Sequence, residues 1–167
     1  MGTIHAKFRN QNKEPIKSKR IDVVTCFIVN REGKVLIETR SDECNLDNGK
    51  IDLCSGHIES GEEPKDAMLR ELKEELSIEN VSKNLQKVYA KYIDIGKRHY
   101  YITFFYLKLE KKINIVINKD EVNRIDWIDM EECFSQMRNG NIRIPKSSEY
   151  EELFEEVRKA NKYSQNN

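Results

Sequence analysis

The chain has 167 residues, a length typical of one domain large enough to bury a hydrophobic core. Its 29 basic and 29 acidic residues cancel, so no net field favours binding to nucleic acid or to a membrane. The mean hydropathy of −0.76 indicates a soluble protein, and no apolar run approaches the roughly 20 residues of a membrane span.

Residues 1–20 lack the apolar segment of a signal peptide, so we expect a cytoplasmic protein with reduced cysteines. The four cysteines show no CxxC spacing and therefore predict no zinc site. The same 20 residues are polar and basic, and they form either a loose arm or an edge strand; both alternatives stay open.

The first half of the chain predicts strands that lead to a loop. The β-branched and aromatic run VVTCFIVN, residues 23–30, predicts a buried strand. A turn separates it from KVLIETR, residues 34–40, and the two strands form a predicted hairpin. Residues 41–50 are turn formers and charges, typical of a loop that lies over a site. IDLCSG, residues 51–56, predicts one short strand that runs into a glycine-containing loop.

The helix predicted to follow this loop has two different faces. An apolar stripe that can pack on a sheet is formed by Met68, Leu69, Leu72 and Leu76. The other face collects Glu71, Glu74 and Glu75, which stand at i, i+3 and i+4. Because like charges so close repel, the arrangement costs stability. A set of carboxylates suits Mg²⁺ or Mn²⁺, whereas a solvated acidic face is the ordinary interpretation of a bare run of Glu and Lys.

The second half of the chain predicts three further strands and then two helices: residues 86–95, 99–109, 125–128, 129–138 and 148–163. The first two of these strands form a hairpin whose many aromatic side chains mostly pack in the core. Strands around one long helix, with a further helix at the end, predict an α/β fold with a mixed sheet between helices. We expect a domain at residues 21–163 and a polar tail at residues 164–167.

Residues 56–78, GHIESGEEPKDAMLRELKEELSI, resemble the Nudix box, G-x5-E-x7-R-E-U-x-E-E-x-G-U, in which U is a bulky aliphatic residue. Eight box positions are in register: Gly56, Glu62, Arg70, Glu71, Leu72, Glu74, Glu75 and Ile78. Only Ser77 departs, since the family has glycine there, near the end of the helix where a left-handed residue is common. The resemblance implies the Nudix-type α/β/α sandwich with a mixed β-sheet.

The resemblance also implies an activity. Nudix enzymes typically hydrolyse a nucleoside diphosphate linked to another moiety, with the help of Mg²⁺ or Mn²⁺. The implied metal ligands are the backbone carbonyl of Ser55 and the carboxylates of Glu71, Glu74, Glu75 and Glu121. The implied catalytic residues are Glu74, Glu75, Glu121 and Arg70, and Arg70 would hold a neighbouring carboxylate in place. For Glu121, a solvated turn carboxylate remains the competing interpretation.

Three basic side chains are candidates for contact with the substrate: Arg40, His57 and His99. For each of the two histidines, an ordinary surface position is the competing interpretation. The expected partner is a small-molecule nucleotide diphosphate derivative, with no membrane and no strong evidence for nucleic acid; a homodimer stays open. ADP-ribose, dinucleoside polyphosphates, nucleoside triphosphates, NADH, coenzyme A and capped RNA are all used in the superfamily, and no second motif selects among them.

Two other functions compete with the hydrolase. Isopentenyl-diphosphate isomerase shares the fold and a similar GH-x3-GE loop, but it has a catalytic cysteine where this chain has Ser55. Cys54 is one residue away, and strand alternation predicts that its side chain points away from the metal loop and into packing. A module that binds nucleotides without cutting them would usually have lost box carboxylates, which this chain keeps.

Overall fold

The computed structural model of the protein describes residues 19–41, 49–95, 97–143 and 150–165. Most of the predicted arm, most of the predicted loop at 41–50, the start of the last predicted helix and the end of the tail lie outside these residues. None of the described helices is long and apolar enough to cross a membrane.

The described residues form seven strands and three helices. In chain order they are β1 (Ile21–Val29), β2 (Lys34–Arg40), β3 (Ile51–Asp52), β4 (Cys54–His57), α1 (Pro64–Leu76), β5 (Leu85–Ile95), β6 (Arg98–Lys108), β7 (Val122–Asp129), α2 (Met130–Arg138) and α3 (Glu151–Gln165). The bounds of β2 are those that the pattern predicts. The last helix begins and ends later than the expected 148–163.

The strands form one mixed sheet in the order β3-β2-β1-β6-β5, to which β4 is added on β1 and β7 on β2. β1 runs parallel to β6 and antiparallel to β4. The predicted hairpin of β1 and β2 is confirmed at its turn, where Val29 pairs with Val35. β2 pairs with β7 from Lys34 to Arg40, and its far end pairs with β3 at Glu38 and Thr39.

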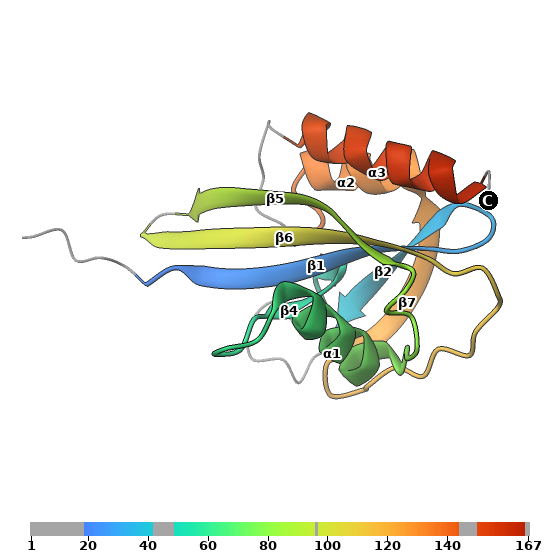
Figure 1. Ribbon diagram of the computed structural model, residues 1–167, viewed down its shortest axis with the longest axis horizontal. Coiled ribbons are helices and arrows are strands. Elements are labelled where there is room, and N and C mark those ends of the chain that lie inside the picture. The colour runs from blue at the N-terminus through green and yellow to red at the C-terminus, as the bar shows by residue number, and fades with distance from the viewer. Residues whose placement is uncertain (1–18, 42–48, 96, 144–149, 166–167) are drawn as a thin grey trace, which may run out of the picture.

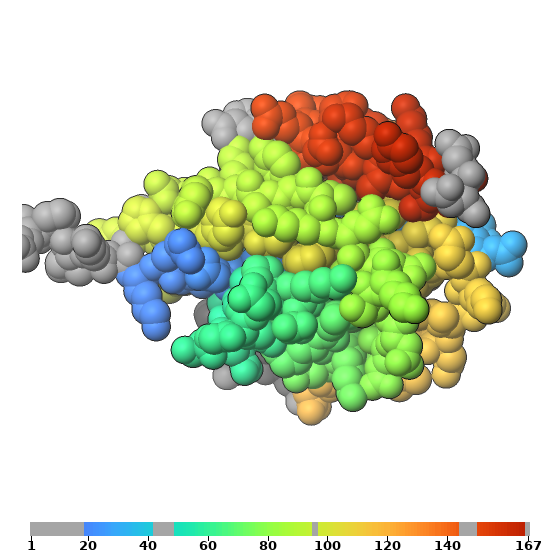
Figure 2. Space-filling model, viewed as in Figure 1, coloured from blue at the N-terminus to red at the C-terminus, as the bar shows by residue number. Residues whose placement is uncertain are grey.

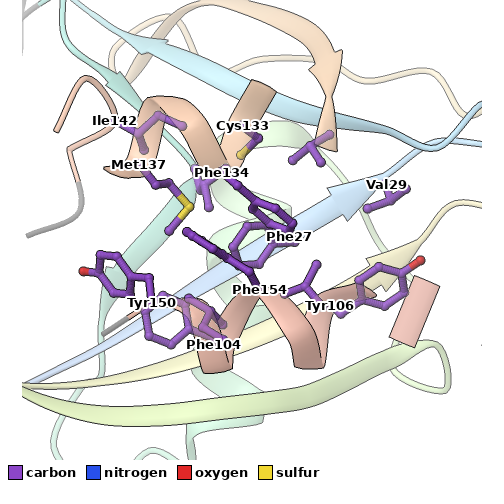
Figure 3. Close-up of a cluster of buried hydrophobic side chains, with 14 of the residues drawn as sticks. Phe27, Val29, Phe104, Tyr106, Cys133, Phe134, Met137, Ile142, Tyr150 and Phe154 are labelled. Carbon is purple, nitrogen blue, oxygen red and sulfur yellow. The ribbon is translucent and has the colours of Figure 1, made fainter. Parts of the chain in front are cut away.

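Helices cover both faces of this sheet, with α2 and α3 on one side and α1 on the other (Figure 1). The larger core lies under α2 and α3, where the rings of Phe134 and Phe154 stack with centroids 4.2 Å apart (Figure 3). Each fully buried phenylalanine of this kind stabilises the fold by about 1.5–3 kcal/mol. The space-filling view shows α3 packed directly against β5 (Figure 2). The predicted α/β/α sandwich is confirmed.

The strand predicted at residues 51–56 is two strands. β3 pairs with β2, where Glu38 faces Asp52, whereas β4 pairs with β1, where Cys26 faces Cys54. The chain crosses from one neighbour to the other at Leu53, which is fully buried. Both pieces have the composition of a strand, so the pattern alone does not reveal the crossing. As a result β4 lies directly beneath α1.

Helix α1 ends at Ser77 in the left-handed conformation, with φ 55° and ψ 32°. The backbone N–H groups of Ser77 and Ile78 donate to the carbonyl oxygens of Lys73 and Leu72, each at 3.0 Å. This is the helix end for which the family uses glycine. The serine therefore keeps the geometry, at the cost of an unfavourable φ.

Candidate active site

Helix α1 lies over β4 so that two carboxylates stand above two alternate residues of the strand. Glu71 and Glu75 are one helical turn apart, and Gly56 and Cys54 share one face of β4. A Cβ atom built on Gly56 would overlap the carboxylate of Glu71. The glycine is therefore required, because the carboxylate occupies the space of a side chain.

Arg70 connects the box loop to the helix. Its Nε and Nη2 donate to the two carboxylate oxygens of Glu62, both at 3.0 Å, and Nη2 also donates to the carbonyl oxygen of His57 at 2.9 Å. Its Nη1 donates to Glu71 Oε1 at 2.6 Å and to Glu74 Oε2 at 3.2 Å. These bonds lower the pKa of Glu62 and fix the carboxylate of Glu71 above the loop.

The carboxylates beneath the helix carry more negative charge than the protein neutralises. Glu71 is 7% exposed and Glu75 is 4% exposed. Burial, together with the charges of Glu71 and Glu121, raises the pKa of Glu75 to about 8, and burial also raises the pKa of Glu71. Within the described part of the chain, Glu75 Oε2 is buried without a hydrogen-bond partner. Such a site suits a cation.

Glu121 reaches this site because the preceding segment docks on the end of α1. The N–H of Asn118 donates to the carbonyl oxygen of Glu75 at 2.8 Å, and that of Val116 donates to Leu76 at 3.2 Å. These bonds satisfy carbonyl groups that have no partner within the helix. Asn118 then donates through Nδ2 to Glu121 Oε1 at 3.1 Å, so Glu121 is held within electrostatic reach of Glu71 and Glu75.

A cavity of about 950 Å³ opens beside these carboxylates. Strands β1 and β6 supply a mostly apolar wall of Val23, Thr25, Tyr100 and Ile102. Besides Arg70 and His57, four basic side chains line the same cavity: Arg40, Lys50, Arg98 and Arg143. The cavity therefore combines acidic, basic and apolar surfaces. Such a combination suits a ligand that has both an anionic group and a ring.

The structure brings most of the predicted site residues to this cavity. They are Arg40, Ser55, His57, Arg70, Glu71, Glu75 and Glu121. Two predicted residues are not among those that line it. The side chain of Glu74 is 50% exposed and contacts Arg70. His99 lies near the β5–β6 turn, with Nδ1 2.6 Å from Asp94 Oδ1, although its neighbours Arg98 and Tyr100 do line the cavity.

Two buried acidic residues near the site were missed by the sequence analysis. Glu38 and Asp52 are each 3% exposed, and burial followed by the charge of Glu75 raises the pKa of Glu38 well above its usual range. Arg143 lies 3.2 Å from Asp52, which offsets part of the cost of burying that carboxylate. The available signal was the position of Glu38, since it shares a strand face with Leu36 inside an apolar run.

The expectation for Cys54 is half wrong. Its side chain is fully buried, as predicted. It does not point away from the box carboxylates, since its Sγ lies within 4.8 Å of a carboxylate oxygen of Glu75. The carboxylates come from the helix above β4, which is the face that Cys54 also occupies. Ser55, on the opposite face, lines the cavity where the isomerase has its cysteine.

The comparisons with known proteins agree with this geometry. The family model of the NUDIX domain matches residues 19–148. A Nudix hydrolase of Nostoc sp. (strain PCC 7120) is 43% identical over 58 residues, which is 34% of each chain, so this chain spans about a third of that relative's length.

Solved structures share the fold at low sequence identity. A MutT protein of Methanosarcina mazei is 16% identical with a TM-score of 0.62, over 90% of this chain and 99% of that one. An Ap4A hydrolase of C. elegans is 16% identical with a TM-score of 0.61, over 88% and 99%. With the box in register and its carboxylates assembled beneath α1, the chain belongs to the NUDIX domain family.

Proposed function

We propose that this protein hydrolyses a nucleoside diphosphate linked to another moiety and cuts within the diphosphate. The observation that carries the proposal is the pair of buried carboxylates, Glu71 and Glu75, held beside Glu121 at the end of a cavity with basic walls. A diphosphate could lie between these acidic and basic groups once a cation offsets the carboxylate charge.

The residues present fit Mg²⁺ or Mn²⁺. Hard cations prefer carboxylate and carbonyl oxygens, and the unpartnered buried oxygen Glu75 Oε2 is such a ligand. The ion would be held by Glu71, Glu75, Glu121 and the carbonyl oxygen of Ser55. Glu74, whose exposed side chain now contacts Arg70, would be a further ligand. When bound, the ion would neutralise phosphate oxygens and lower the pKa of water.

The protein's own groups position the reaction. Arg70 holds Glu71 through a 2.6 Å hydrogen bond and holds the box loop through Glu62. Glu121 lines the cavity and is less buried than Glu75, so it is the carboxylate that we propose as acceptor of the proton from the attacking water. Glu75 and Glu74 would support the same step through the charge they add.

The walls of the cavity suit the rest of the substrate. Arg40 brings a guanidinium whose Nε is buried without a hydrogen-bond partner among the described residues, so a phosphate oxygen could accept from it. His57 opens onto the same space, and His99 would contact only the outer end of a long substrate. The apolar side chains of Val23 and Ile102 could pack against a base or ring.

The test is analysis of products from a panel of nucleotides by mass spectrometry. ADP-ribose, dinucleoside polyphosphates, nucleoside triphosphates, NADH, coenzyme A and capped RNA would each be incubated with Mg²⁺, Mn²⁺ or EDTA. We expect two phosphate-bearing products with either metal and none in EDTA. Glu75→Gln should lower kcat by orders of magnitude, whereas the matched change at the exposed Glu110→Gln should not.

Full turnover in EDTA would contradict the metal-dependent hydrolase. Binding of a nucleotide without any product would favour the non-catalytic module, and a kcat for Glu75→Gln within about twofold of the wild type, or roughly 0.4 kcal/mol, would remove Glu75 from the site.

A further inference from the structure

Three buried side chains from three different elements converge beside the cavity. They are Glu38 of β2, Cys54 of β4 and Glu75 of α1, and one ligand atom of each lies within 4.8 Å of the other two. Their exposed fractions are 3%, 0% and 4%. Of the three, only Glu75 is also among the residues that line the cavity.

Two oxygens in this cluster have no partner among the described residues. Glu38 Oε1 and Glu75 Oε2 are both buried and have no donor when both carboxyl groups are ionised, although a proton shared between the two groups would bond them to each other. A buried polar atom left unpaired costs about 1–3 kcal/mol, and a charged one costs more. Two carboxyl groups this close need a positive charge between them, which is either a proton or a cation.

The nearby arginines do not supply that charge. Arg143 pairs with Asp52 at 3.2 Å, and Arg70 pairs with Glu62, Glu71 and Glu74. Asp52 faces the cluster and adds further negative charge, while Arg40 has a smaller effect on Glu38 than burial, Glu75 or Asp52 has. The arginines therefore leave the cluster without a counter-charge, so in the absence of a cation its two carboxyl groups must keep a proton.

We propose that Glu38, Cys54 and Glu75 form a buried binding site for a thiophilic divalent cation of the Zn²⁺ class. The sulfur ligand decides the class, because thiolates select zinc-like ions whereas Mg²⁺ prefers oxygen ligands alone. A tetrahedral Zn²⁺ site with sulfur at about 2.3 Å and oxygen at about 2.0–2.2 Å places its ligand atoms roughly 3.5 Å apart. Side-chain movements of about 1 Å would therefore close the site around an ion.

The ion would enter from the cavity, since Glu75 and Asp52 line it. The fourth position would be filled by water or by a second carboxylate oxygen from that side. On binding, the thiol of Cys54 gives its proton to solvent, and so do the carboxyl groups of Glu38 and Glu75, which share a proton in the metal-free protein. The absence of a CxxC motif does not bear on this site, because its ligands come together only when β2, β4 and α1 pack.

The zinc-class site shares Glu75 with the proposed Mg²⁺ or Mn²⁺ ligands. The competition between the two kinds of cation therefore rests on the proposed function. A zinc-class ion held by Glu38 and Cys54 would draw the Glu75 carboxylate away from the other set. The two kinds of cation should therefore compete, even though their remaining ligands differ.

The experiment is a titration of the full-length, EDTA-stripped protein with Co²⁺, a spectroscopic probe for zinc sites. A cobalt–thiolate bond gives a charge-transfer band in the near ultraviolet. We expect the band in the wild type, its displacement by Zn²⁺ and its loss in Cys54→Ala. The matched control is Cys133→Ala, which removes an equally buried thiol from the other core and should keep the band. Glu38→Gln should weaken Co²⁺ binding by about tenfold or more.

No band in the wild type overturns the proposal, and so does a band that persists in Cys54→Ala. Undiminished affinity in Glu38→Gln would exclude the three-ligand site. Circular dichroism and a thermal melt establish that each variant is folded, and Cys54→Ser replaces Cys54→Ala if the alanine variant does not fold. Because no substrate is present, the result is independent of whether the protein hydrolyses a diphosphate.

Discussion

The replacement of Glu75 by glutamine should change how the stability of the metal-free protein depends on pH. Burial raises the pKa of this carboxyl from 4.5 to about 8 in the folded protein. Between these values the folded protein keeps a proton that the unfolded chain gives up. The stabilisation is therefore fully present below the lower value and is lost as the pH rises through the higher one.

The loss amounts to at most about 1.4 kcal/mol for each pH unit between the two pKa values. The loss of unfolding free energy at about pH 8 is therefore at most about 5 kcal/mol. We expect a loss of a few kcal/mol, because Glu38 and Glu75 share one proton. Glutamine has almost the same volume and no charge. Glu75→Gln should therefore be a few kcal/mol more stable than the wild type at about pH 8 and similar to it at about pH 5.

The assay is urea unfolding followed by circular dichroism, with EDTA present, at several values between about pH 5 and about pH 8. The control is Glu110→Gln, an exposed change that should leave the free energy of unfolding unaltered at every pH. If Glu75→Gln differs from the wild type by the same amount at both ends of the range, Glu75 is not held with a raised pKa. A variant that is less stable at high pH would refute the reasoning outright.

Three further substitutions test the geometry of the box. Ser77→Gly removes a side chain from a left-handed helix end, so the free energy of unfolding should rise by about 1 kcal/mol in urea unfolding; a loss of stability would contradict the argument. Gly56→Ala should displace the carboxylate of Glu71 and lower kcat on the order of 100-fold with the fold retained, and unchanged kinetics would show that the close contact has no role. Arg70→Lys cannot form the two-fold contact with Glu62, so kcat should fall by about tenfold or more; full activity would mean that a single positive charge suffices.

Local pattern was enough for the elements that a sequence specifies by itself. β2 begins and ends where the pattern predicts, and α1 presents the two faces that its apolar stripe and the box predict, since these signals lie within the elements. The register of the box also predicts that Glu71 and Glu75 share a face with each other. Domain limits of 21–163, a cytoplasmic location and a homodimer stay predictions.

The remaining features depend on packing between distant segments. The crossing at Leu53 follows from which neighbours β3 and β4 pair with, and no local pattern records that choice. Glu38 enters the site only because β2 pairs with β3 and so brings its carboxylate within 4.8 Å of Glu75 on α1. Glu121 comes close to Glu71 and Glu75 because backbone N–H groups of the preceding segment bond to carbonyl groups at the end of α1. Backbone hydrogen bonds of this kind cannot be predicted from the side chains of the residues that form them.

The most direct test of the central claim, that this protein hydrolyses a diphosphate, is cleavage in water enriched in oxygen-18. The best substrate of the panel would be incubated with Mg²⁺, and the products would be weighed by mass spectrometry. Attack by water within the diphosphate predicts one labelled oxygen on one phosphate-bearing product, and no reaction with EDTA. Products without the label, or isopentenyl diphosphate that gains deuterium from heavy water while no anhydride is cut, would contradict the hydrolase.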